Sequence, residues 1–164
     1  FAEVSKGLRI LRNHLPQINN LCDMTPEDLK NHIDKIEDPV IRRRVEHVVM
    51  ENARVHKSIE ALEKNDIGLF GEYMKEAHES IRDLYEVTGP ELDAMFEEAL
   101  AVPGVVGARM TGAGFGGCTV NIVERDAADE FISVVGKNYE KRTGLKPAFY
   151  ICDIGDGVRE IVLR

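Results

Sequence analysis

The residues whose types and spacing could do chemistry are concentrated in one glycine-rich segment, residues 107–118. Five of these twelve residues are glycine, and apolar runs flank the segment on both sides. Glycine inside a regular element costs about 0.5–1 kcal/mol relative to alanine, so the cluster indicates a backbone that needs left-handed dihedral angles or the close approach of a ligand or another backbone. Successive N–H groups in such a turn can form a nest that holds an anion. The segment is therefore the first candidate for a binding loop.

Two nucleotide-binding motifs are disfavoured by the residues that surround the glycines. Gly112, Gly114 and Gly117 match the spacing of the dinucleotide fingerprint, which requires a helix after the last glycine. Here residues 118–122 alternate between apolar and polar, as a strand does. A Walker phosphate loop needs a final Lys-Ser or Lys-Thr, and none closes this run. A glycine-rich hairpin with a purely structural role remains the alternative to a binding loop.

The cysteines and histidines do not predict a second chemical site. Cys22, Cys118 and Cys152 are odd in number and far apart, which favours a reducing cytosol over a disulfide framework. Cys118 and Cys152 lie in strand-like runs, where we expect buried, inert thiols. His47 and Glu51 are four residues apart on a predicted helix, without the further ligands that a metal needs. We expect no metal site.

Composition and charge argue against several classes of protein. The 164 residues, 43% hydrophobic and 30% charged, are typical of a globular domain or a piece of a larger protein. No apolar run approaches the roughly 20 residues of a membrane span, so no membrane association is predicted. The net charge is −8 and the longest basic run is residues 42–44, which we expect on a solvated helix face; nucleic-acid binding is not predicted. Because the first residue is Phe1, we expect a cut or cloned fragment.

Helical patterns fill the first hundred residues. Thr25, Asp38 and Asp66 each stand directly before a helical pattern, where their side chains can cap it. Apolar residues recur at spacings of three and four over residues 41–62 and again over residues 67–84. The two stripes predict an antiparallel helical hairpin that packs stripe to stripe.

Strand patterns begin after the helices. Residues 105–111 and 118–124 predict two strands around the glycine loop, a helix follows, and residues 148–154 and 158–163 predict two more strands. The order strand, strand, helix, strand is three-quarters of a split βαβ, or ferredoxin-like, unit, whose first strand has no counterpart here. The predicted fold class is α+β. One domain, residues 1–164, would comprise a helical segment (1–103) and a ferredoxin-like α/β sandwich (104–164) that lacks its first strand.

The glycine segment also carries a family resemblance. Residues 108–118, Ala-Arg-Met-Thr-Gly-Ala-Gly-Phe-Gly-Gly-Cys, resemble the third conserved motif of the GHMP kinases in its galactokinase form. Further segments resemble galactokinases in the same order, so that the likeness covers about residues 25–160: residues 42–49, 78–87, 90–93 and 149–150. The glycine motif supports the superfamily, and the flanking segments narrow it to galactokinases. Ala113 stands where many galactokinases have another glycine.

The resemblance implies a GHMP kinase C-terminal domain of a cytoplasmic enzyme that uses ATP and Mg²⁺ to phosphorylate the anomeric hydroxyl of galactose. In that family the sugar-binding motif, the nucleotide phosphate loop and the catalytic Asp lie in the amino-terminal half, and no Pro-x-x-x-Gly-Leu-x-Ser-Ser motif occurs in this sequence. Galactose and ATP would therefore bind through that other half. We expect no catalytic residue in this chain, no activity of the chain alone and no tightly bound ATP.

The resemblance also implies which residues form the site. The loop would lie near the phosphates of the nucleotide, as a close-packed wall with a few N–H donors. Arg109 stands at its entrance, where we expect a structural ion pair, with a phosphate contact as the alternative. The loop residues are Thr111, Gly112, Ala113, Gly114, Phe115, Gly116 and Gly117.

Several alternatives stay open at this stage. The parent protein could be another GHMP sugar 1-kinase or a galactokinase-like sensor that binds sugar and ATP without catalysis, and the chain could also be a free ligand-binding module. The missing first strand would leave open strand edges. We expect that residues 148–154 pair directly with 118–124, that residues 158–163 fill the gap, or that a second copy of the chain forms a dimer there.

Overall fold

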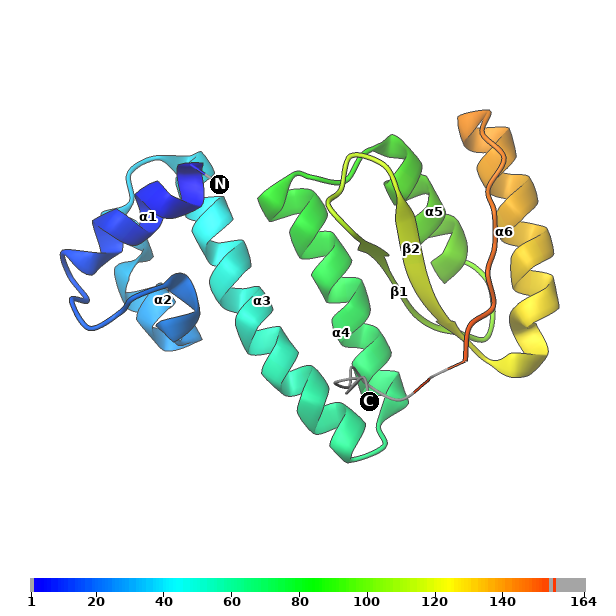
Figure 1. The fold of residues 1–164 in the computed structure, drawn as a ribbon, viewed down its shortest axis with the longest axis horizontal. Coiled ribbons are helices and arrows are strands. Elements are labelled where there is room, and N and C mark those ends of the chain that lie inside the picture. The colour runs from blue at the N-terminus through cyan, green and yellow to red at the C-terminus, as the bar shows by residue number, and fades with distance from the viewer. Residues whose placement is uncertain (1, 154, 156–164) are drawn as a thin grey trace, which may run out of the picture.

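The first layer of the computed structural model is a group of short helices packed on one long one (Figure 1). The structure describes residues 2–153 and 155. Helix α1 (Ala2–Arg12) and helix α2 (Pro26–His32) are joined through the turn η1 (Leu21–Asp23), and the turn η2 (Ile33–Lys35) leads on to α3. The predicted cap at Thr25 is confirmed, because its hydroxyl accepts the Asp28 N–H at 3.1 Å. Leu11, Ile36 and Val45 are fully buried at the centre of this layer.

The predicted antiparallel hairpin is formed by α3 (Pro39–Glu63) and α4 (Ile67–Ser80), which lie side by side in Figure 1. Asp38 and Asp66 cap the two helices, as predicted, by accepting backbone N–H groups. Packing stripe to stripe is wrong for the second half of α3. Val55, Ile59 and Leu62 are 49%, 47% and 43% exposed, because they line an open groove.

A two-stranded antiparallel sheet follows the helices. Helix α4 ends in a π-helical turn, η3, and α5 leads into β1, the glycine loop and β2, after which the turn η4 leads into α6. Arg109 pairs with Val120 in the register of the strands, and a bulge lies between Val105 and Gly107. The bounds are η3 (Ile81–Tyr85), α5 (Pro90–Leu100), β1 (Val105–Thr111), β2 (Cys118–Val123), η4 (Arg125–Ala127) and α6 (Ala128–Thr143).

Helices pack on β1 from two sides. On one face Phe96 of α5, Ala108 of β1 and Phe131 of α6 share one buried cluster. On its other side, β1 packs so closely on α4 that two glycines face each other. A Cβ added at Gly107 of β1 would lie 2.6 Å from the Cα of Gly71 of α4. The helices and the hairpin together confirm the predicted α+β class.

The prediction of a strand over residues 148–154 is wrong for the part that the structure describes. Residues 145–153 carry no strand, and within the described residues the sheet consists of β1 and β2 alone. In a split βαβ unit this strand pairs with the first one, so without that neighbour it has no backbone partner. Phe149 instead packs edge to face on Phe131 of α6, with ring centroids 6.0 Å apart. The predicted strand 158–163 lies outside the described residues.

Two further expectations concern the surface. Within the described residues no helix has both the length and the apolar character that a membrane crossing requires. The expectation of buried thiols is wrong for Cys118 and Cys152, which are exposed free cysteines. No further strand lies beside β2 in the part of the chain that the structure describes, and Cys118 is uncovered there.

Candidate functional site

The glycine loop, residues 111–117, has the left-handed backbone that its composition predicts. Gly112, Gly114, Gly116 and Gly117 have φ angles of 93°, 86°, 120° and 125°. Phe115 has a φ of 57°, and its side chain is 78% exposed. A bulky residue in this region is a conformational outlier that the surrounding structure must hold in place.

The loop is held against the turn that follows α4. The Phe115 N–H donates to the carbonyl oxygen of Val87 at 2.8 Å. A side chain at Gly114 would overlap the same carbonyl, whereas nothing lies within 4 Å of a Cβ added at Gly112 or Gly116. Glycine is therefore needed at position 114 both for its positive φ angle and for the close approach to the Val87 carbonyl. At positions 112 and 116 it is needed for the positive φ angle alone.

A buried histidine fixes the strand that leads into the loop. His78 on α4 is fully buried, and its Nδ1 accepts the N–H of Met110 at 3.0 Å. Its Nε2 lies 3.3 Å from Oδ1 of Asp93, and its ring stacks on Phe96 with centroids 3.8 Å apart. Burial lowers the pKa of His78, so the neutral ring with its proton on Nε2 satisfies both contacts at neutral pH. One side chain thus joins α4, α5 and the last part of β1.

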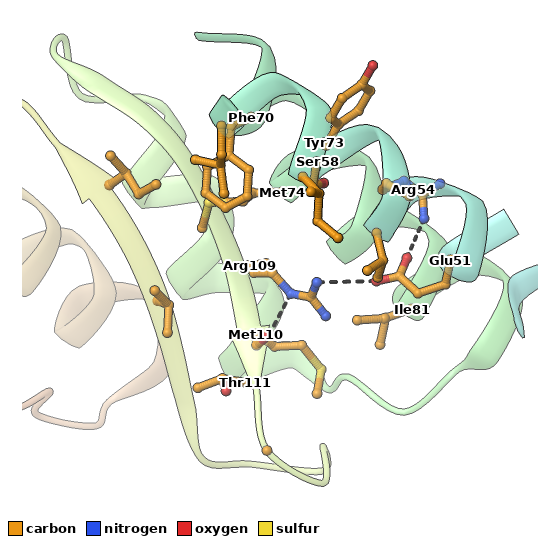
Figure 2. A pocket seen from close by; sticks show the side chains of 16 residues that line it. Glu51, Arg54, Ser58, Phe70, Tyr73, Met74, Ile81, Arg109, Met110 and Thr111 are labelled. Carbon is orange, nitrogen blue, oxygen red and sulfur yellow. Dashed lines mark hydrogen bonds and ion pairs between the residues drawn. The ribbon is translucent and has the colours of Figure 1, made fainter. Parts of the chain in front are cut away.

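Arg109 lies at the entrance of the loop and belongs to a network of charges. It forms an ion pair with Glu51 of α3, its Nη1 lying 3.2 Å from Oε1, and its Nε donates to the Met110 carbonyl (Figure 2). Glu51 also binds Arg54, which in turn lies 3.3 Å from Glu76. The structural ion pair that was expected of Arg109 is present. The Arg109 side chain is 36% exposed, so part of it still faces solvent.

A groove of about 510 Å³ extends from this network along α3, α4 and the sheet. Figure 2 shows Phe70, Met74 and Arg109 among the side chains that line it. Most of its wall is apolar, and Thr111 and Gly112 of the loop form one part of the wall. The loop and the groove therefore make one continuous surface.

This arrangement can bind an anionic group, but the loop contains no pair of side chains for acid–base catalysis. Residues 111–117 include no titratable side chain, and their polar groups are backbone N–H and C=O groups and the exposed hydroxyl of Thr111. Among residues 2–153 and 155, no group of three His, Cys, Asp or Glu is placed to hold a metal ion. The loop suits contact with an anionic group by N–H donors at left-handed positions.

Comparison with known families decides the relationship. The family model described as GHMP kinases C terminal matches residues 58–141, which is half of the chain and includes the whole glycine loop. The chain belongs to the GHMP kinases. The matched region of this GHMP kinase runs from α3 through most of α6.

Individual relatives of this GHMP kinase are galactokinases. A galactokinase of Halalkalibacterium halodurans is 47% identical over 158 residues, and one of Clostridium acetobutylicum is 49% identical over 160. The alignments cover 96% and 98% of the chain and 40% and 41% of those proteins. The crystal structure of Lactococcus lactis galactokinase complexed with galactose superposes with a TM-score of 0.91 at 38% identity, covering 95% of the chain and 40% of that protein. The chain therefore spans about two fifths of the length of these relatives.

The sequence predicted a glycine loop between two strands, which the structure confirms, but it did not predict the residues that anchor this loop. His78, Val87 and Asp93 lie inside segments that resemble galactokinases, yet their own spacing assigned them no contact with the loop. A signal for His78 was present, since it lies beside Ala77 on the apolar stripe of α4. A histidine at such a position needs partners for both ring nitrogens when it is buried. Val87 contributes only a backbone carbonyl, for which the sequence carries no signal.

Proposed function

We propose that the chain is the C-terminal part of an ATP-dependent galactokinase, which phosphorylates D-galactose at its anomeric hydroxyl. The observation that supports this most strongly is the glycine loop, which stands on anchored strands in a fold that superposes on a galactokinase with a TM-score of 0.91. The galactokinases of the comparison support the sugar as substrate and ATP as phosphoryl donor. Three exposed, unpaired cysteines are in keeping with a reducing compartment such as the cytoplasm.

In this proposal the loop binds and positions the transferring phosphoryl group and does not transfer protons. Phosphoryl transfer depends mainly on positioning and on stabilising charge at the transferring group. The left-handed backbone around Gly112 and Gly116 is open to an incoming group, and Thr111 adds an exposed hydroxyl. Arg109 at the loop entrance keeps part of its side chain exposed, where it would meet a phosphate. We assign no described residue to Mg²⁺, which would be held with ATP by other residues.

A coupled kinase assay on the intact protein tests the proposal. We expect MgATP-dependent phosphorylation of galactose, with phosphate found at C1 by NMR. A panel with N-acetylgalactosamine and arabinose separates the other sugar 1-kinases. Binding of galactose and ATP by calorimetry without turnover would contradict the proposal and favour a sensor.

A further inference from the structure

The turn after α4, residues 84–87, contains a left-handed backbone conformation that contacts with other residues must stabilise. Helix α4 passes into the π-helical turn η3, and the N–H of Glu86 donates to the carbonyl of Ile81 at 2.7 Å. Glu86 has φ 57° and ψ 47°, a left-handed conformation that is uncommon for a residue with a long side chain. The next residue, Val87, is the one whose carbonyl accepts the Phe115 N–H of the glycine loop.

Arginines of α3 hold this turn. Arg44 donates through Nη1 to the carbonyl of Leu84 and through Nη2 to the carboxylate of Glu86. The Arg44 side chain is only 12% exposed, whereas Arg43 is more exposed and reaches the same carboxylate at 3.4 Å. The expectation that the basic run lies on a solvated face is therefore wrong for Arg44. The hydrogen bond from Arg44 lowers the pKa of Glu86, so the carboxylate is charged at neutral pH.

We infer that Arg44 is a positioning residue for the glycine loop, acting through Glu86 and the Val87 carbonyl. The planar guanidinium binds two acceptors of one turn at once and so fixes the direction of the peptide that follows. That peptide presents the Val87 carbonyl against Gly114 and Phe115. The consequences for turnover rest on the proposed function, whereas those for the loop backbone do not.

Hydrogen–deuterium exchange of the intact protein, followed by mass spectrometry of peptides that cover residues 111–118, tests this inference. In Arg44→Met we expect exchange of the peptide that contains Phe115 to rise about tenfold or more, because both hydrogen bonds from Arg44 to the turn are lost. Peptides of α6 serve as the internal reference and should exchange as in the wild type. Arg44→Lys, whose ammonium is a compact point charge without the planar fork, should give an intermediate rate.

The neighbouring Arg42 supplies a matched control. It lies on the same helix and also binds backbone carbonyls, but those of Asp34 and Ile36, away from the turn. Arg42→Met should lower overall stability without a rise confined to the loop. Wild-type loop exchange in Arg44→Met, or in Arg44→Lys should the first variant fail to fold, would overturn the inference. An equal rise in Arg42→Met would also overturn it.

Turnover of the same variants separates this inference from the proposed function. We expect Arg44→Met to lower kcat while the KM for galactose stays near the wild-type value. Rapid loop exchange together with unchanged kcat would support positioning by Arg44 and contradict the role proposed for the loop in phosphoryl transfer.

Discussion

At the scale of single residues, the loop glycines are not equivalent. Gly114 combines a positive φ with a position where an added Cβ would overlap the Val87 carbonyl oxygen, whereas nothing lies within 4 Å of a Cβ added at Gly116. Gly116→Ala therefore meets backbone strain alone, because a residue with a Cβ rarely adopts its φ of 120°. Gly114→Ala meets backbone strain at a φ of 86° and must also push the loop away from Val87.

We predict that Gly114→Ala lowers the kcat of the intact kinase by about two orders of magnitude, because small displacements of positioning groups are that costly. Gly116→Ala should lower it much less. Thermal melting of both variants should show only small losses, since the loop is exposed. Equal kcat losses in the two variants would show that contact with Val87 does not matter.

The buried histidines predict how stability depends on pH. Burial lowers the pKa values of both His47 and His78 below the ordinary value of 6.5. Below about pH 6.5 the unfolded chain takes up protons that the folded chain does not, so stability is complete above that pH and falls as the pH decreases toward the folded pKa values. His78→Gln removes one of these two contributions.

The test compares urea midpoints at about pH 7.5 and about pH 5.5. We expect His78→Gln to be less stable than wild type at both, because the Met110 N–H loses its partner, and to show a smaller drop between the two. His56→Gln, at an exposed position of α3, is the control. If the urea midpoint of His78→Gln fell between the two pH values by as much as that of wild type, the pH dependence assigned to His78 would be wrong.

At the scale of elements, the contact between α4 and β1 depends on two glycines. A Cβ at Gly71 would overlap the backbone carbonyl of Val106. We predict that Gly71→Ala destabilises the protein by about 1–3 kcal/mol through overpacking, although alanine favours helices. Gly68→Ala on the same helix meets only Asp66 Oδ1 at 3.6 Å and should be neutral or stabilising. Urea unfolding of both variants measures the difference.

The open edge of β2 leads to a second prediction at this scale. Within the described residues β2 pairs only with β1, and Val120 is half exposed beside the free edge. Unpaired edges invite strands of other chains, and lysine on an edge opposes this. We predict that the 164-residue chain self-associates with rising concentration and that Val120→Lys weakens the association. Sedimentation equilibrium measures both. A wild-type chain that stays monomeric at its highest attainable concentration would contradict the prediction.

At the scale of the whole molecule, the chain aligns with about two fifths of the length of its galactokinase relatives. We predict that the isolated 164-residue chain neither phosphorylates galactose nor binds MgATP tightly, because its sequence lacks the phosphate-loop motif of the family. A coupled assay and calorimetric titration test this. Turnover of galactose by the purified chain would contradict it.

The sequence by itself determined the loop and most of the helices. Capping residues such as Thr25 and Asp66 act over three positions, and glycine-dependent angles are local, so both can be predicted from adjacent residues. The glycine motif and its flanking segments also identified the family. Local structure could be predicted wherever the hydrogen bond or dihedral angle that a residue needs involves only positions close to it along the chain.

Only the tertiary structure decided what the loop rests on. The contacts of Phe115 with Val87, of His78 with Met110 and of Arg44 with Leu84 join residues 28 to 40 positions apart. The predicted strand is absent from residues 148–153 for a related reason, since a strand is stable only when another backbone pairs with it. Val55 and Ile59 follow a helical apolar stripe and are nevertheless exposed, because burial depends on whether another element covers that face.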